Sequence, residues 1–293
     1  MKKNLFDSFL RILSRITHKN VLYISNTHIK PSDIAVKSNH GFWYCGNIFD
    51  QGDVAYGVAN NGTVEEFDTN LVKSILNTLK KDYVFYDIGA NSGWYTALAS
   101  QVSDLATIHS FEPLEEYIDC IKGTVSLNKA TERNHIHNFA LSDTNGKTKI
   151  RLAGSGSSLE KDFLSIDRGQ REIEIRTLDS FAKETNMLNP DFIKIDVEGH
   201  EFKVLKGAEE ILEKSKPILF IEIAYTLRTV GSNFIHADFE KIFSMLEKMN
   251  YVPFISKDNK LTKYSTATKP DGVFMFLFLN KEKHKNLLET YNK

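Results

Sequence analysis

The sequence predicts an α/β protein built on a seven-stranded, mostly parallel sheet with one antiparallel strand. Apolar strand-like runs alternate with helix-like segments from about residue 80 onward. The predicted strands are nearly continuous apolar runs, which is typical of parallel strands covered by helices on both faces. The last two predicted strands, 251–257 and 272–280, have no helix between them. We therefore expect these two to pair antiparallel.

Each element follows from its residue pattern, read in chain order. Helical spacing of Leu71, Ile75 and Leu79 predicts a first helix within residues 65–81. The strand-like runs then alternate with amphipathic segments up to residue 257. The predicted strands are 83–89, 107–113, 135–141, 191–199, 217–224, 251–257 and 272–280, and the predicted helices between them are 94–102, 115–128, 200–212 and 238–250.

The 293-residue chain is long enough for one large domain with an appendage. Residues 1–65 are predicted to form an N-terminal helix and a small irregular β appendage. Residues 66–293 are predicted to form the main domain, with a hairpin-like insertion near 146–176. The insertion carries two alternating segments around a Gly/Ser-rich stretch, which suggests a mobile tip or lid.

The first 20 residues are apolar on one face, but Asp7 and Arg11 interrupt the apolar run. This pattern favours an amphipathic helix over a signal peptide. We expect the apolar face to pack on the protein or on a sister subunit, with weak peripheral membrane contact as the alternative. No run elsewhere is long enough for a transmembrane helix.

The composition of the chain indicates which classes of partner are unlikely and in which cellular compartment the protein is expected. The formal net charge is -1 and the sequence pI is near 6.8, so no overall basic field attracts nucleic acid. The two cysteines, Cys45 and Cys120, lie far apart without a CxxC or Cys/His cluster. Neither a disulfide framework nor a zinc site is indicated, and we expect a cytoplasmic protein.

A glycine turn follows the first strand of the predicted domain. The segment DIGANSG places Asp87 at the strand end and then runs Gly89-x-Asn91-x-Gly93. A dinucleotide fingerprint would read GxGxxG, so that the backbone can approach a pyrophosphate. A carboxylate at this position repels a pyrophosphate. The turn therefore suits a ligand that carries an ammonium or sulfonium charge.

A second acidic residue supports a nucleoside ligand at the same edge of the sheet. Glu112 ends the next predicted strand, 23 positions after Gly89. In sites of this layout a carboxylate there accepts hydrogen bonds from two ribose hydroxyls. A turn that tolerates a cation, followed by a ribose-binding acid, predicts S-adenosylmethionine. The alternative is that the glycines only make a tight turn and that Glu112 is solvated.

Four segments together resemble the FkbM family of S-adenosylmethionine-dependent methyltransferases: YVFYDIGANSGWYT, IHSFEPLEEYIDCIKGTVSLN, NFALSD and IKIDVEGHEFKVLKGAEEIL. The resemblance covers roughly residues 80 to 225, and its most specific parts are DIGANSG and KIDVEGHE. It implies the class I methyltransferase (Rossmann-like) fold. It also implies O-methylation, commonly of sugar hydroxyls on glycans or natural products.

The resemblance also implies roles for individual residues of the cofactor half. Around the methionine moiety of S-adenosylmethionine it places Asp87, Gly89, Asn91 and Gly93, and on the ribose it places Glu112. Further contacts are expected on the adenine side. These are Asn128, which could instead cap a helix, Ala140, and Asp143, which could instead be a turn residue.

The catalytic groups are expected at the ends of the strands after the cofactor half. Asp196, Glu198 and His200 lie within one predicted strand-to-helix turn, and Glu222 lies on the next strand. In one mechanism, Asp196, Glu198 and Glu222 hold a divalent cation such as Mg²⁺ that orients the acceptor. In the other, which we favour slightly, they bind sugar hydroxyls while His200 acts as general base.

Simpler roles exist for some of these residues, since Glu198 could cap the following helix and His200 could lie on a helix surface. The predicted function is O-methylation of a hydroxyl of a sugar in a glycan or natural product. The alternatives are another small-molecule, lipid-linked or protein acceptor, and a non-catalytic cofactor-binding protein. A nicotinamide-dependent oxidoreductase is disfavoured by Asp87 and by the missing glycine pattern.

Overall fold

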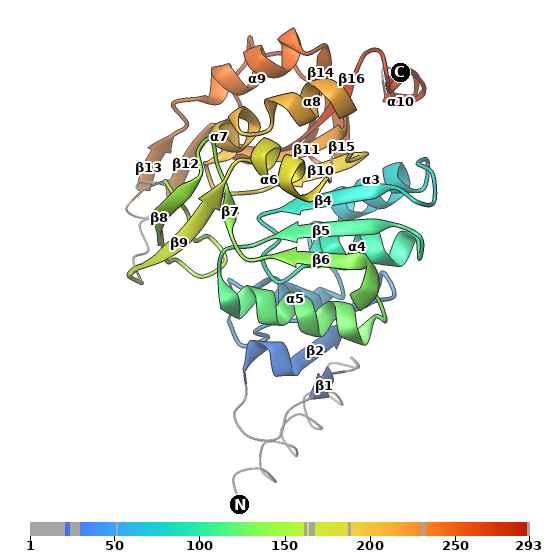
Figure 1. Cartoon of the computed structure of the whole chain (residues 1–293), viewed down its shortest axis with the longest axis vertical. Helices are drawn as coiled ribbons and strands as arrows, with labels where there is room; N and C mark the ends of the chain where they lie inside the picture. Colours follow the sequence, from blue (N-terminus) through green and yellow to red (C-terminus); the bar gives the residue numbers. More distant parts are fainter. Residues whose placement is uncertain are drawn as a thin grey trace, which may run out of the picture.

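A computed structural model describes residues 21–23, 30–50, 52–160, 163, 168–186, 189–229 and 232–291. The amphipathic helix predicted within residues 1–20 lies outside the described residues. The described chain contains a large central sheet with helices on both of its faces (Figure 1).

The central sheet has the strand order β15-β14-β16-β11-β10-β4-β5-β6. The strands from β6 to β11 in this order are parallel to one another, and β16 runs antiparallel between β11 and β14. The predicted antiparallel pairing of the last two strands is therefore confirmed. The bounds are β4 (Val84–Ile88), β5 (Thr107–Phe111), β6 (Asn134–His137), β10 (Phe192–Ile195), β11 (Ile218–Ala224), β14 (Tyr251–Lys257), β15 (Lys260–Lys263) and β16 (Val273–Asn280).

All seven predicted strands are present, and β15 adds an eighth at the edge. It pairs antiparallel with β14 through a two-residue turn, Asp258 and Asn259, whose φ angles are 53° and 56°. Two residues with positive φ match the twist of a tight hairpin. The strand β15 is short and contains two lysines and only one apolar residue. For this reason no strand was predicted within residues 258–271.

Helices cover each face of the sheet, and alternate residues of each strand point to opposite faces. Phe85, Phe192 and Phe220 pack toward α2, α3 and α4, whereas Ile193 and Ile221 pack toward α6 to α9. The helix bounds are α2 (Val54–Asn61), α3 (Glu66–Leu76), α4 (Trp94–Val102), α5 (Glu115–Leu127), α6 (Leu178–Thr185), α7 (Glu201–Lys206), α8 (Glu209–Ser215), α9 (Phe239–Lys248) and α10 (Lys285–Tyr291), with short 3-10 turns η1 (Pro31–Asp33) and η2 (Thr131–Arg133).

The segment before α3 forms a small sheet against the main body. Strands β1 (Val21–Tyr23), β2 (Ile34–Lys37) and β3 (Trp43–Cys45) pair antiparallel. The rings of Phe42 and Tyr44 lie 4.9 and 5.5 Å from the Trp94 ring of α4. These aromatic residues therefore make a hydrophobic contact with the main body. A domain boundary near residue 65 stays a prediction.

Two further strand pairs lie at the carboxyl ends of the parallel strands. β8 (Gly146–Arg151) and β9 (Gln170–Arg176) form an antiparallel hairpin that β7 (Ala140–Leu141) joins, and β12 (Thr226–Thr229) pairs with β13 (Ser232–Ile235). In Figure 1 the arrowheads of β4, β5 and β6 point toward β7, β8 and β9. The loops of these strand pairs therefore surround the edge of the sheet where ligands bind in α/β folds.

The helix α6 was not predicted. It begins after Thr177, whose Oγ1 accepts a hydrogen bond from the Ser180 backbone N–H at 3.2 Å. It buries Leu178, Phe181 and Ala182 against the sheet. At eight residues it is shorter than the window in which helical periodicity is clear.

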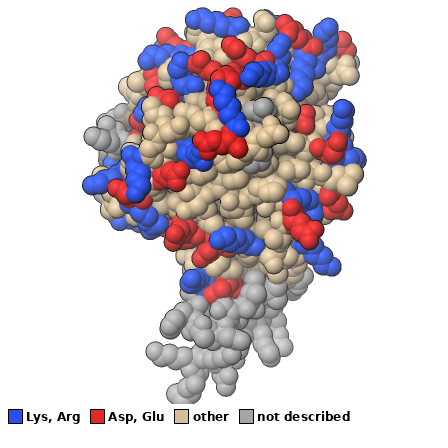
Figure 2. Space-filling model, in the orientation of Figure 1, with Lys and Arg blue, Asp and Glu red and all other residues tan. Residues whose placement is uncertain are grey.

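Within the described part of the chain, no helix combines the length and apolarity needed to span a bilayer. On the face drawn in Figure 2, basic and acidic side chains are interspersed. That face of the described residues therefore presents no broad basic patch of the kind that binds a phosphate backbone.

Candidate active site

The glycine turn between β4 and α4 lies against the end of β10. Gly89 has a φ of 71°, and a Cβ atom at this position would lie 1.8 Å from the backbone oxygen of Asp196. Only glycine fits this position, because a side chain would overlap with backbone and the φ angle is unfavourable for other residues. The close approach brings the glycine turn and the KIDVEGHE motif together at one point.

Glu112 follows β5, and its side chain forms a hydrogen bond with the backbone of the glycine turn. Its Oε2 accepts a hydrogen bond from the Asn91 backbone N–H at 2.9 Å, and its Oε1 accepts one from the Leu114 N–H at 3.0 Å. The side chain is only 6% exposed, and burial raises the pKa of its carboxyl group to about 7. Each oxygen keeps a further lone pair, so the carboxylate can accept ligand hydroxyls.

A cavity at this edge of the sheet has a polar side and an apolar side. Gly89, Asn91 and Glu112 line one part, and Asp196 and Glu198 line another. The apolar side holds residues that suit a flat, uncharged ring: Leu114, Tyr117, Ala140, Leu141, Ile150 and Leu159. Tyr117 was not among the predicted site residues. It lies in the first turn of α5, just after Glu112, and this position in the sequence could have identified it.

The structure disagrees with two of the predicted adenine-side residues. Asn128 lies at the far end of α5, where its side chain bonds the backbone N–H and C=O of Trp43 at 2.9 and 2.7 Å. Asp143 is exposed in a turn, where it accepts a hydrogen bond from Ser142 Oγ at 3.2 Å. Neither residue lines the cavity, whereas Ala140 does. A helix of 13 residues carries its C-terminus away from the sheet edge where it began.

Two residues of the predicted methionine-side group, Asp87 and Gly93, lie outside the cavity lining. Gly93 has a φ of 88° and starts α4. Asp87 is completely buried, and its Oδ2 accepts a hydrogen bond from Thr96 Oγ1 at 2.7 Å. Its Oδ1 has no hydrogen-bond donor and lies 3.9 Å from Lys194 Nζ. Burial raises the pKa of the Asp87 carboxyl group, and the charge of Lys194 opposes this shift.

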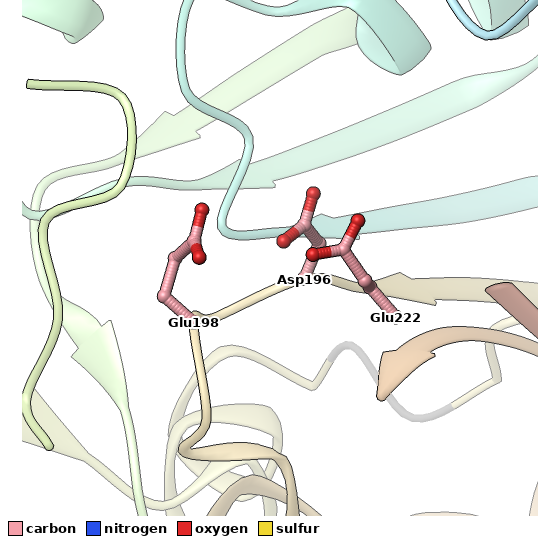
Figure 3. A group of neighbouring side chains, drawn as sticks. All are labelled: Asp196, Glu198 and Glu222. Atoms are coloured by element: carbon pink, nitrogen blue, oxygen red, sulfur yellow. The ribbon is translucent and has the colours of Figure 1, made fainter. Parts of the chain in front are cut away.

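Three carboxylates converge at the ends of β10 and β11. Asp196, Glu198 and Glu222 each offer an oxygen atom within 4.8 Å of the others (Figure 3). Asp196 and Glu222 point to the same face of the sheet because their strands are in register, Lys194 being opposite Phe220. Glu198 has a φ of 56°, which turns its side chain back toward the other two. Convergence of these three could not be derived from sequence.

A buried lysine, Lys194, lies beside this cluster and forms an ion pair with Asp196. Lys194 Nζ lies 3.1 Å from Asp196 Oδ2 and 3.2 Å from the Gly89 carbonyl oxygen. Burial alone would lower the pKa of Lys194, but the charges of Asp196 and Asp87 outweigh it and raise that pKa. Desolvation, followed by the charge of Asp196, raises the pKa of Glu198 and Glu222 well above its usual range. The site therefore combines one ammonium group with several carboxylates.

His200 lines the cavity, and its role as a general base stays a prediction. His200 is 5% exposed, and both of its ring nitrogens already have partners: Glu160 Oε1 lies 2.7 Å from Nδ1, and Ser142 Oγ lies 2.9 Å from Nε2. The hydrogen bond from His200 lowers the pKa of Glu160 to about 2.

The loop between β8 and β9 closes one side of the cavity. Ser155, Ser157 and Leu159 line it, and the Ser155 carbonyl oxygen accepts a hydrogen bond from Asn91 Nδ2 at 3.4 Å. Ser158 Oγ donates to the Glu198 carbonyl oxygen at 2.5 Å. Together with the Glu160–His200 pair, these bonds connect the predicted lid to the glycine turn and to the KIDVEGHE motif.

Comparisons with known proteins identify the family of the chain. Residues 87–253 match the family model described as the Methyltransferase FkbM domain. The hexuronic acid methyltransferase AglP of Haloferax volcanii is 24% identical over 159 residues, which cover 53% of this chain and 62% of that protein. The 2-O-methyltransferase NoeI of Sinorhizobium fredii is 27% identical over 161 residues, which cover 49% and 65%. The matched part of the chain thus spans less than two thirds of either relative.

Among solved structures, the FkbM methyltransferase from Methylobacillus flagellatus KT is similar with a TM-score of 0.45 and 19% sequence identity. The match covers 68% of this chain and 44% of that one.

Proposed function

Because the chain belongs to the FkbM methyltransferase family, we propose that it transfers the methyl group of S-adenosylmethionine to a hydroxyl group of a sugar. The observation that carries the proposal is the meeting of the glycine turn, Glu112 and three carboxylates at one edge of the sheet. The printed descriptions of two relatives, a hexuronic acid methyltransferase and a 2-O-methyltransferase, support O-methylation and a saccharide acceptor.

The residues of the cavity fit S-adenosylmethionine by their chemistry. Glu112 offers two carboxylate oxygens to the ribose hydroxyls, and the apolar side formed by Leu114, Tyr117 and Ile150 suits adenine. The buried Asp87, with an oxygen that lacks a hydrogen-bond donor, adds negative charge where a cationic ligand binds. When bound, the cofactor supplies an electrophilic methyl carbon on a good leaving group.

We propose that Asp196 is the general base. The acceptor oxygen must form a bond to the methyl carbon as the carbon–sulfur bond breaks, and its proton must leave. Asp196 lines the cavity beside Gly89, and Lys194 orients its carboxylate. The proton therefore passes from the acceptor hydroxyl to an Asp196 oxygen, while Glu198 and Glu222 accept hydrogen bonds from the acceptor.

The same carboxylates raise the question of a divalent cation. Asp196, Glu198 and Glu222 are oxygen ligands of the kind that Mg²⁺ prefers. However, an ammonium group already lies 3.1 Å from Asp196 Oδ2, and it would repel a metal ion at this position. We therefore propose transfer without a metal, with Lys194 as the cation of the cluster.

The test uses S-adenosylmethionine labelled in its methyl group and a panel of sugar glycosides, with and without EDTA. We expect label in the sugar, unchanged by the chelator. Loss of activity with EDTA that Mg²⁺ restores would make the three carboxylates metal ligands. Transfer to proteins or lipid-linked acceptors but to no sugar would overturn the proposed acceptor class.

Cofactor affinity should depend on the ionisation of Glu112. Its pKa is raised to about 7, so the carboxylate that accepts the ribose hydroxyls is lost as the pH falls through this value. We expect affinity for S-adenosylmethionine to decrease below pH 7, by up to about tenfold per pH unit. Calorimetric titrations between pH 5.5 and 8.5 measure this slope. Glu112→Gln should bind more weakly and without this slope, and a wild-type affinity independent of pH would contradict the assignment.

A further inference from the structure

A turn with unusual backbone angles carries the Glu198 side chain into the site. Glu198 and Gly199 are consecutive residues with positive φ, 56° and 96°. A left-handed backbone is unfavourable for a residue that has a side chain, and it persists only where surrounding contacts hold it. Glu198 lines the cavity, and Figure 3 shows its carboxyl group directed toward Asp196 and Glu222. The contacts that hold this turn therefore decide where Glu198 points.

The peptide group between Glu198 and Gly199 is held at both of its polar ends. Ser158 Oγ donates a hydrogen bond to the carbonyl oxygen of this peptide at 2.5 Å. Glu201 Oε1 accepts a hydrogen bond from its N–H at 2.9 Å. Ser158 belongs to the loop between β8 and β9, and Glu201 is the first residue of α7. Two side chains thus fix the orientation of a single peptide plane.

A buried histidine holds the Glu201 side chain in turn. His236 lies between β13 and α9, and its Nε2 is 3.1 Å from Glu201 Oε2. Its Nδ1 accepts a hydrogen bond from the Asp238 backbone N–H at 3.2 Å. Nδ1 therefore carries no proton, and Nε2–H is the donor to Glu201. Each oxygen of the buried Glu201 carboxyl group thus has its own N–H donor.

The stability of the fold alone does not account for this buried polar pair. Burying a carboxyl group and an imidazole is costly unless both are hydrogen-bonded, and an apolar pair of similar size is often at least as stabilising. The Glu201–His236 pair does what an apolar pair cannot, because it presents an acceptor to the Gly199 N–H. Its position next to a residue of the cavity lining indicates a role in the site.

We propose that Ser158, Glu201 and His236 are positioning residues that direct the Glu198 carboxyl group toward the acceptor sugar. They fix the peptide that follows Glu198, and this side chain then contacts one hydroxyl of the acceptor while Asp196 faces the hydroxyl that is methylated. This inference rests on the proposed function and adds three residues that its mechanism does not use. The three come from the insertion, from the start of α7 and from the segment before α9.

The experiment uses labelled S-adenosylmethionine and the methyl glycosides of glucose, galactose, mannose and glucuronic acid. The variants are measured with the glycoside for which the wild-type protein has the highest kcat/KM. In His236→Ala, KM for this glycoside should rise roughly 5- to 50-fold, because the contact with Glu198 is lost. Its kcat should change by less than about threefold, and affinity for S-adenosylmethionine should stay unchanged. His236→Gln should return KM to within about threefold of wild type, since its amide N–H can replace Nε2 as the donor to Glu201.

Two further variants keep the test independent of folding defects. Ser158→Ala removes only a hydroxyl group and acts on the same peptide from its other end, so it should raise the acceptor KM even if His236→Ala does not fold. The matched control is His284→Ala. His284 is also buried, and its Nδ1 accepts the Asn280 backbone N–H at 2.9 Å, but it lies outside the cavity lining. We expect this control to lose stability and keep the wild-type KM.

Combination with Glu198→Ala separates positioning from packing. Glu198→Ala should raise the acceptor KM at least as much as His236→Ala, and adding His236→Ala to it should change KM by less than about twofold. Increases that multiply in the double variant, or an unchanged KM in both His236→Ala and Ser158→Ala, would overturn the inference alone. So would an equal increase in His284→Ala. A wild type that methylates no sugar would overturn the proposed function and this inference with it.

Discussion

Asp196→Asn is expected to lower kcat by a factor of about 10²–10⁴. The amide keeps the shape of the side chain and can still accept the hydrogen bond from Lys194 Nζ, but it cannot take a proton from the acceptor. Because Glu112 and the apolar side of the cavity are untouched, affinity for S-adenosylmethionine should stay close to that of the wild type. Single-turnover transfer of labelled methyl groups and a calorimetric titration measure the two quantities separately.

The matched control is Asp143→Asn. This residue also follows a strand end, but it is exposed and outside the cavity lining. We expect it to keep the wild-type kcat. If Asp196→Asn retained full activity, the base would have to be another group, and Glu222→Gln would be the next variant to measure.

Gly89→Ala is expected to reduce the free energy of unfolding by more than about 2 kcal/mol and to abolish cofactor binding. The new methyl group would lie 1.8 Å from the Asp196 carbonyl oxygen, so the ends of β4 and β10 would have to separate. The φ of 71° adds the conformational cost of a side chain in the left-handed region. Chemical denaturation and titration with S-adenosylmethionine measure these effects.

Gly169→Ala isolates the conformational part of this cost. Gly169 has a φ of 100°, but a Cβ atom built there would have no described atom within 4 Å. We expect a loss of roughly 1 kcal/mol with normal cofactor binding. Equal effects of the two substitutions would show that the contact between Gly89 and Asp196 does not restrict the turn.

The sequence predicted those parts of the site that depend on local order along one strand. Alternation along β10 puts Lys194 and Asp196 on one face and Ile195 and Val197 on the other, and the hydrophobic clusters of the structure agree. Parallel strands bring their carboxyl ends to one edge, so the glycine turn, Glu112 and Asp196 could be expected together. Ala140, which the family resemblance placed at the cofactor, does line the cavity.

The predictions failed where a role depends on the direction of a side chain or the length of a helix. Asn128 was assigned to the cofactor. However, it follows the last residue of the 13-residue helix α5, far from the cavity, and accepts a hydrogen bond from the backbone N–H of Trp43 in β3. The hydrogen bond between Glu160 of the insertion and His200 Nδ1 was not predicted either. Glu160 lies 40 residues earlier, and no periodicity relates the two.

The sequence by itself determined the central sheet, in which one of the seven predicted strands runs antiparallel to the others, and the chemistry of the glycine turn. Periodicity and short-range turn chemistry carry that information, because each depends on neighbours within about one element. Tertiary structure alone decided which distant charges meet. The convergence of Asp196, Glu198 and Glu222 depends on strand register and on the positive φ of Glu198. These are properties of the packed chain, in which contacts join residues far apart in sequence.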